Sequence, residues 1–225
     1  MENKFKSGYV GIVGRPNVGK STLLNYMVGQ KIAIISDKPQ TTRNKILAIM
    51  SDSDSQVVFL DTPGFHKPKN KLGENMIKAV KETVAEVDLL LMVIEPNDEP
   101  RENELKIIEK LGNTPAILVI NKVDSVQKDL ILPVIAKYSK LHNFKEIIPI
   151  SAKTGYGIEA LKKEIKDNLS DGPMYYPEEM VTDQQERQIV AEIIREKMLN
   201  LLDKEVPHGV AIIVNEFKNQ FLKEA

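Results

Sequence analysis

Short apolar runs alternate with amphipathic stretches between residues 8 and 170. The apolar runs predict strands over residues 10–13, 46–50, 56–60, 88–94, 116–120 and 147–150. Apolar positions at helical spacing predict helices over residues 20–28, 73–86, 100–111, 128–141 and 157–169. The polar stretch at residues 51–55 reads as a hairpin turn between the second and third strands. Repeated strand–helix units therefore predict an α/β fold, a three-layer α/β/α sandwich with a mainly parallel sheet and one antiparallel edge hairpin.

The character of the chain changes near Ser170. Asp171-Gly172-Pro173 is a turn signal, and residues 172–182 read as an extended linker. A helix is expected over residues 183–204 and a strand over residues 210–214. One helix and one strand cannot bury their apolar faces alone, so this piece docks on the first domain, meets a partner or belongs to a larger module. The expected division is a domain over 1–171, the linker, and a second, incomplete α+β piece over 183–225.

Composition and charge narrow the class of protein. Of the 225 residues 42% are hydrophobic, which is enough for a packed core and excludes a disordered chain. The formal net charge of −1 argues against a protein that coats nucleic acid non-specifically. The absence of cysteine excludes disulfides and zinc–thiolate sites. The N-terminus has no apolar signal-peptide run and no stretch is long enough to span a bilayer, so we expect a cytoplasmic protein.

A glycine-rich segment joins the first expected strand to the first expected helix. Gly14-Arg15-Pro16-Asn17-Val18-Gly19-Lys20-Ser21 fits the phosphate-binding loop pattern in the place where that pattern must lie. Loop N–H groups and the helix dipole would hold nucleotide phosphates, Lys20 would reach the outer phosphate oxygens and Ser21 would ligate Mg²⁺. The residues expected to contact nucleotide here are Gly14, Arg15, Pro16, Asn17, Val18, Gly19, Lys20, Ser21 and Thr22.

Three further loops follow expected strands, and each is ambiguous alone. Asp61-Thr62-Pro63-Gly64 offers a carboxylate for Mg²⁺ and an N–H for a γ-phosphate, or is a plain turn. In Asn121-Lys122-Val123-Asp124 a carboxylate can accept hydrogen bonds from the N1–H and amino group of guanine, or Asp124 caps a helix. Ser151-Ala152-Lys153 offers the Ala152 N–H to the guanine oxygen. Together with the phosphate loop, in this order, these segments predict a guanine-nucleotide site.

This set of motifs resembles the translation-factor-related GTPases, and its detail is similar to the Era family of bacterial ribosome-assembly GTPases. The closer match rests on residues 29–43, 61–68, 172–178, 191–197 and 205–208 and covers essentially the whole chain. The resemblance implies hydrolysis of GTP to GDP and phosphate by a P-loop GTPase. It also implies a switch in small-subunit assembly and in processing of 16S-type ribosomal RNA. The expected partners are GTP and GDP, and the small ribosomal subunit with its rRNA 3′ end. A peripheral contact with the inner face of the cell membrane is also expected. The chain is expected to be a monomer.

The resemblance also assigns roles around the γ-phosphate. Thr42 in the first switch joins Ser21 and Asp61 as an expected Mg²⁺ ligand, and the residues expected to act in hydrolysis are Lys20, Asn17, Thr42 and Gly64. Phe65 stands where many regulatory GTPases have a water-orienting glutamine, so unaided hydrolysis is expected at about 10⁻⁴–10⁻² s⁻¹. Asn17 suggests that K⁺ supplies the missing charge, although asparagine also suits a turn.

The family's second domain is a KH-type RNA-binding module, which needs a Gly-x-x-Gly loop. No such loop follows Gly172, so the chain is expected to hold only the opening helix and strand of that module. Three alternatives stay open at this point. A tRNA-modification GTPase shares the phosphate loop, a binding module without turnover is compatible with Phe65, and an ATPase is disfavoured by Asp124.

Overall fold

A six-stranded sheet in the order β2-β3-β1-β4-β5-β6 forms the centre of the molecule. The computed structural model describes residues 4–35, 46–61, 83–97, 99–201, 212–214 and 216, with the backbone alone for Asp61, Leu199 and Asn200. The strands are β1 (Lys6–Gly14), β2 (Ile46–Asp52), β3 (Ser55–Asp61), β4 (Leu89–Ile94), β5 (Ala116–Ile120) and β6 (Glu146–Pro149). The helices are α1 (Lys20–Val28), α3 (Glu102–Leu111), α4 (Ile131–Tyr138), α5 (Ile158–Asp167) and α6 (Glu186–Leu201), with short 3₁₀ turns at Val123–Ser125 and Lys128–Leu130.

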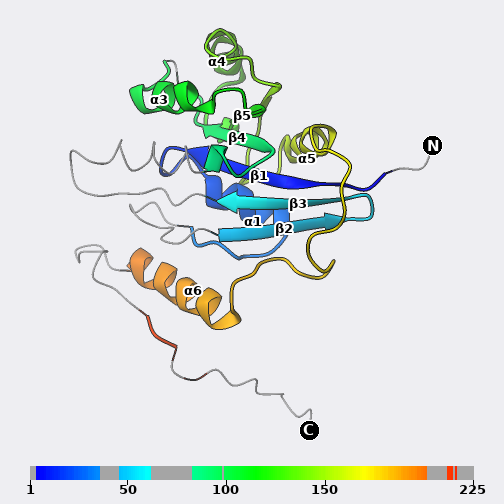
Figure 1. The fold of residues 1–225 in the computed structure, drawn as a ribbon. Coiled ribbons are helices and arrows are strands. Elements are labelled where there is room, and N and C mark those ends of the chain that lie inside the picture. Colours follow the sequence, from blue (N-terminus) through cyan, green and yellow to red (C-terminus); the bar gives the residue numbers. More distant parts are fainter. Residues whose placement is uncertain are drawn as a thin grey trace.

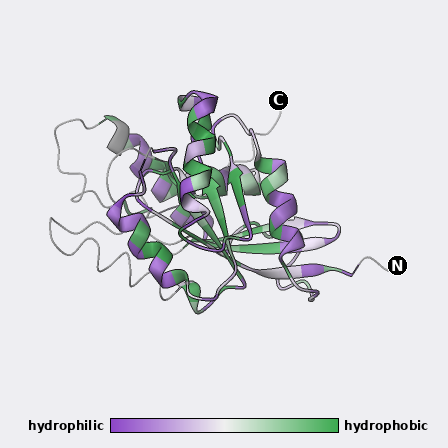
Figure 2. Ribbon diagram, turned by 90° about the horizontal axis from the view of Figure 1, so that it is seen from above, coloured by the Kyte–Doolittle hydropathy of each residue, from purple (hydrophilic) through white to green (hydrophobic). Residues whose placement is uncertain are grey.

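Helices cover both faces of the sheet, which confirms the expected α/β/α layering. On one face, the even-numbered β1 residues Val10 and Ile12 pack in a buried cluster with residues of α1 and α5. On the other face, Val13 and β4 pack in a second cluster with α3 and α4. Figure 2 shows the apolar strands between helices whose outer surfaces are hydrophilic. Because β4 and β5 are buried along their whole length, their sequences are continuous apolar runs without alternation.

The strand directions bring the ends of five strands to one edge. β1 pairs in parallel with β3 and β4, β4 with β5, and β5 with β6. Only the pair of β2 and β3 is antiparallel, as the hairpin pattern predicts. Chain segments that leave β1, β3, β4, β5 and β6 therefore meet at the carboxyl edge of the sheet, where open α/β sheets bind their ligands.

The sequence predicts most element bounds, with four differences. β1 begins at Lys6 rather than near residue 10, and the hairpin turn is tighter because both its strands extend into residues 51–55. The helix expected over 128–141 is a 3₁₀ turn followed by the shorter α4. Residues 212–214 of the strand expected over 210–214 are described without strand pairing. Of the helix expected over 73–86, residues up to 82 lie outside the described residues.

The segment after α5, residues 172–182, has no named helix or strand and is tied to the sheet by side-chain contacts. The Gln56 side chain accepts hydrogen bonds from the N–H groups of Tyr175 and Tyr176 and donates to the Tyr176 carbonyl at 2.9 Å. The Tyr175 ring stacks on that of Tyr9 with centroids 5.3 Å apart. Burial and the Tyr176 side chain raise the pKa of Tyr9. The linker is thus fixed along the sheet.

Helix α6, drawn below β2 in Figure 1, contacts the segment that follows α1. The buried Glu196 carboxylate accepts hydrogen bonds from Lys31 Nζ at 2.7 Å and from the Ile35 N–H at 3.2 Å. Of the three outcomes that the sequence left open, these contacts support docking of α6, and they do not test whether the piece belongs to a larger module. Within the described part of the chain, no helix combines the length and the apolar character needed to cross a bilayer.

Candidate functional site

The backbone of the loop between β1 and α1 packs tightly against neighbouring residues and adopts positive φ angles. Asn17 and Gly19 have positive φ angles of 63° and 95°, a region that glycine and asparagine tolerate best. A Cβ on Gly14 would lie 2.3 Å from the Val93 carbonyl oxygen, and one on Gly19 would lie 2.2 Å from Asn121 Nδ2. Packing against β4 and against Asn121, the residue after β5, therefore requires glycine at both positions.

The N-terminus of α1 fits a phosphate group. Its first turn holds no acidic residue, and Gly19 at the N-cap offers no side chain to satisfy the helix N–H groups. The buried Lys20 folds back over the loop, where its Nζ donates hydrogen bonds to the carbonyls of Gly14 and Arg15, both at 2.9 Å. These carbonyls fix the ammonium above the loop, where phosphate oxygens would meet it.

Asn121 joins three of the predicted loops. Its side chain is buried, with Nδ2 donating to the Val18 carbonyl at 2.8 Å and Oδ1 accepting from the Ala152 N–H at 2.9 Å. The predicted phosphate loop, the loop after β5 and the loop after β6 are thereby held together through one amide. The Ala152 N–H that the sequence assigns to guanine is engaged by Asn121 in this structure.

Lys122 adds a second link between the same loops. It has a positive φ of 65°, and its Nζ donates to the Asn17 carbonyl and to Glu95 Oε1, both at 2.6 Å. Asp124 lies exposed in the 3₁₀ turn that follows, where its carboxylate is open to a base. Ser151 is buried and its Oγ accepts from the Thr154 N–H at 3.2 Å, while Lys153 is exposed.

Two carboxylates that were not predicted from the sequence bind the Arg15 side chain of the predicted phosphate loop. Glu95 follows β4 directly and lies 3.3 Å from the guanidinium of Arg15. Glu104 of α3 is fully buried and accepts from Arg15 Nε at 2.8 Å. The Arg15 side chain therefore faces α3 rather than the nucleotide. Glu95 could have been predicted from its place in the sequence, because it directly follows the carboxyl end of an expected strand.

A depression of about 510 Å³ adjoins the loop on the α1 side. It is lined by Thr22, Asn25, Tyr26, Gly29, Gln30, Lys31, Ile35 and Ala152. Thr22 and Ala152 are predicted nucleotide contacts, so the depression touches the predicted site at the start of α1 and at the loop after β6. Asn25 shapes its wall: Nδ2 donates to the Ala33 carbonyl at 2.7 Å, and Oδ1 accepts from the N–H groups of Ile32 and Ala33.

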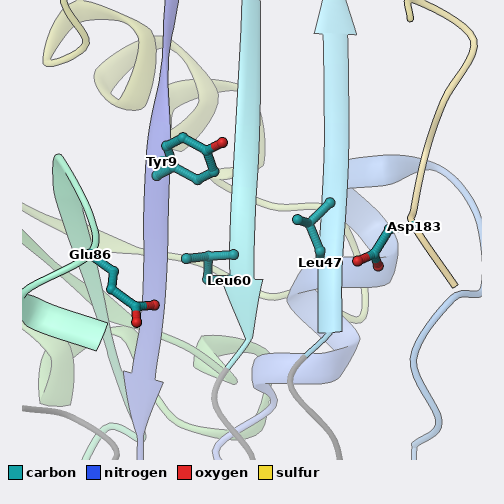
Figure 3. Close-up of a pocket in the computed structure, with 5 residues that line it drawn as sticks. All are labelled: Tyr9, Leu47, Leu60, Glu86 and Asp183. Carbon is teal, nitrogen blue, oxygen red and sulfur yellow. The ribbon is translucent and has the colours of Figure 1, made fainter. Parts of the chain in front are cut away.

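A second depression, of about 520 Å³, lies on the sheet face opposite α1 and is lined by Tyr9, Leu47, Leu60, Glu86 and Asp183 (Figure 3). None of these residues belongs to the predicted nucleotide set. We therefore separate it from the site.

The residues predicted around the γ-phosphate are only partly described. Thr42, Thr62, Pro63, Gly64 and Phe65 lie outside the described residues. Asp61 ends β3, next to β1, and Ser21 lies in the first turn of α1, so both predicted Mg²⁺ ligands follow strands that are neighbours in the sheet. Hydroxyl and carboxylate oxygens are the donors that Mg²⁺ prefers, and the described residues hold no larger His, Cys, Asp or Glu cluster for a metal. The donor set fits Mg²⁺ held jointly with a nucleotide.

Comparison with known proteins identifies the family. Residues 9–122 match the family model of the 50S ribosome-binding GTPases. The chain is 54% identical over 223 residues to GTPase Era of Clostridioides difficile (strain 630), spanning 98% of this chain and 75% of the relative. It is 52% identical over 218 residues to GTPase Era of Ruminiclostridium cellulolyticum, spanning 96% and 73%.

Two solved structures agree with this match. A variant of Aquifex aeolicus Era bound to GDP and AlF₄⁻ has a TM-score of 0.82 and 41% identity, over 90% of this chain and 70% of that one. Era in complex with MgGDPNP and nucleotides 1506–1542 of 16S ribosomal RNA has the same TM-score and identity, over 91% and 70%. The fold is thus shared over nearly the whole chain, and the chain belongs to the Era family of GTPases.

Proposed function

We propose that this GTPase works as a switch that binds GTP in the loops around Lys20, Asn121 and Asp124 and governs engagement of the small ribosomal subunit. The observation that carries the proposal is the joining of the phosphate loop to both base loops through Asn121. A nucleotide held there contacts all three loops at once, so binding and loop order depend on each other. The proposed setting is a monomer in the cytoplasm, where ribosomal subunits assemble; the peripheral membrane contact stays a prediction.

The proposed chemistry is positioning and charge stabilisation. Lys20 Nζ and the N–H groups of the loop hold the phosphates, and the carboxylate of Asp124 accepts from guanine. Ser21 and Asp61, together with Thr42, would hold Mg²⁺, which neutralises charge on the β- and γ-phosphate oxygens when bound. Gly64 would contact the γ-phosphate through its N–H.

The proposed RNA target is the 3′ end of small-subunit rRNA. The description of the matched family names the 50S ribosome, the large subunit. The solved Era complex instead contains 16S ribosomal RNA, which belongs to the small subunit. The complex is the more specific guide, because it matches 91% of this chain and the family model matches residues 9–122 only. The chain spans about three quarters of the length of its curated relatives, so RNA engagement is proposed for this part alone, through the first switch around Thr42 together with helix α6.

GTP hydrolysis with and without purified small ribosomal subunits tests this proposal. We expect slow turnover alone, at about 10⁻⁴–10⁻² s⁻¹, and faster turnover with small subunits but not with large ones. Stimulation by large subunits alone would contradict the choice of partner. Tight GTP binding with no turnover in a single-turnover assay would instead favour a nucleotide-holding module, the alternative that Phe65 keeps open. The tRNA-modification alternative is not retained, because the family is that of Era.

We propose K⁺ as a second cofactor, with Asn17 as its protein ligand. Asn17 is exposed at the top of the loop, but its φ of 63° also gives it a backbone role. Asn17→Gly separates the two roles, because glycine tolerates this φ and lacks the side-chain oxygen. We expect hydrolysis to be about tenfold faster in KCl than in NaCl for the unmodified chain and equal in both salts for Asn17→Gly.

Asn17→Asp is the matched control, since it keeps an oxygen at this position and is tolerated at positive φ. It should retain a K⁺ response. A K⁺ response that survives in Asn17→Gly would refute the assignment of Asn17.

A further inference from the structure

We propose that Glu104 of α3 is a positioning residue for the phosphate-binding loop, acting through Arg15 on the catalytic ammonium of Lys20. The inference rests on the assignment of Gly14 to Ser21 as the phosphate loop. Glu104 lies outside every motif of the site, and 89 positions separate it from Arg15 in the sequence.

The geometry gives Glu104 a fixed orientation. Its Oε2 accepts from the Tyr138 hydroxyl at 2.7 Å and from the Arg101 N–H at 2.8 Å, and its Oε1 accepts from Arg15 Nε at 2.8 Å. The carboxylate is 1% exposed and Tyr138 is equally buried. Burial and Glu104 raise the pKa of Tyr138, so its hydroxyl remains a donor. Two donors from α3 and α4 thus set the direction in which Glu104 meets the loop.

Arg15 transmits this orientation to Lys20. Its side chain is held on the α3 side by Glu104 and by Glu95, while its own carbonyl accepts a hydrogen bond from Lys20 Nζ at 2.9 Å. Releasing the guanidinium would remove the contacts that anchor Arg15, the residue that supplies one of the two carbonyls placing the ammonium. A displacement of about 1 Å in a positioning group commonly costs about 100-fold in rate.

Glu95 contacts Arg15, which precedes Pro16. Through Lys122 it also acts on Asn17, which follows Pro16. It accepts from Lys122 Nζ at 2.6 Å, and Lys122 donates to the Asn17 carbonyl. One pair of carboxylates therefore holds the Arg15 side chain and the Lys122 ammonium, which in turn contacts the Asn17 carbonyl. Only Glu104 is tied to the opposite layer of helices, so it is the residue to test.

The variants Glu104→Gln and Tyr138→Phe test the proposal. The readouts are the affinity for GDP, the affinity for GMP and the rate of GTP hydrolysis. GMP lacks the outer phosphates that Lys20 reaches. We expect Glu104→Gln to weaken GDP binding about tenfold and to lower kcat about tenfold, with GMP binding unchanged. In a Lys20→Met background, Glu104→Gln should weaken GDP binding no further, because both changes remove the same interaction. Tyr138→Phe should act in the same direction with a smaller effect.

Leu111→Ala is the matched control for loss of stability, since Leu111 is fully buried in α3 and belongs to the core cluster rather than to the Arg15 contacts. It should lower Tm without changing the ratio of GDP to GMP affinity. Equal weakening of GDP and GMP, or an additive loss in the Lys20→Met background, would overturn the proposal. If Glu104→Gln fails to fold, an unchanged GDP to GMP ratio in Tyr138→Phe overturns it. Failure of the unmodified chain to bind GDP would instead contradict the proposed site itself.

Discussion

Replacing Lys20 by methionine is expected to lower the rate of GTP hydrolysis by about 10²–10³-fold, the usual cost of losing one preorganised charge at a transition state. Methionine keeps the apolar stem of this buried side chain but loses the ammonium that donates to the Gly14 and Arg15 carbonyls. Single-turnover hydrolysis at saturating GTP isolates this effect from weaker binding.

Lys162→Met is the control, because this α5 lysine pairs with the exposed Glu159 at 2.9 Å and lies outside the predicted nucleotide motifs. Its turnover should equal that of the unmodified chain. If Lys20→Met hydrolyses GTP within about threefold of the unmodified rate, catalytic stabilisation by Lys20 is wrong.

Asp124→Asn is expected to weaken GDP binding by about 10²–10⁴-fold, since two hydrogen bonds to a charged acceptor are lost. The same change should strengthen binding of xanthosine diphosphate. Xanthine has a carbonyl oxygen where guanine has its amino group, and the asparagine amide offers one acceptor and one donor to match it. Competition with a fluorescent nucleotide measures both affinities.

Asp129→Asn provides the matched control, as Asp129 is an exposed carboxylate in the next 3₁₀ turn. It should leave both affinities unchanged. Equal losses for the guanine and xanthine nucleotides in Asp124→Asn would mean that Asp124 stabilises its turn and does not recognise the base.

Local patterns predict the parts of the fold that depend on local signals. The bounds of α1 and β5 agree with the sequence, because glycines flank α1 and β5 is a continuous apolar run between Pro115 and Asn121. The start of β1 was not predictable in this way. Ser7 and Gly8 are buried, but they are held by the Ser170 carbonyl and by the packing of Leu169, which lie at the far end of the domain.

The site shows the same division between local and distant causes. Each nucleotide motif follows a strand, so one sequence suffices to place Gly14 to Ser21, Asn121 and Ser151 on one sheet edge. The role of Glu104 depends on Tyr138 and Arg15, 34 and 89 positions away. On a helix with several other charged residues, nothing local marks this glutamate as buried. The short α4 differs, since its features are local: a 3₁₀ turn over Lys128–Leu130 precedes it, and Pro133 lies in its first turn.

The contact of the linker with β2 has a consequence for solubility. β2 is an outer strand of the sheet, and the linker occupies its open side: the Ile49 N–H donates to the Val181 carbonyl at 2.9 Å, and Thr182 bridges to Ala48 and Leu47. A fragment cut at residue 171 would leave these backbone groups free to pair with another molecule, which is the usual route to edge-to-edge aggregation. A GTPase fragment that ends after Thr182 keeps its own edge covered, so the smallest aggregation-resistant unit is longer than the domain bounds read from the sequence.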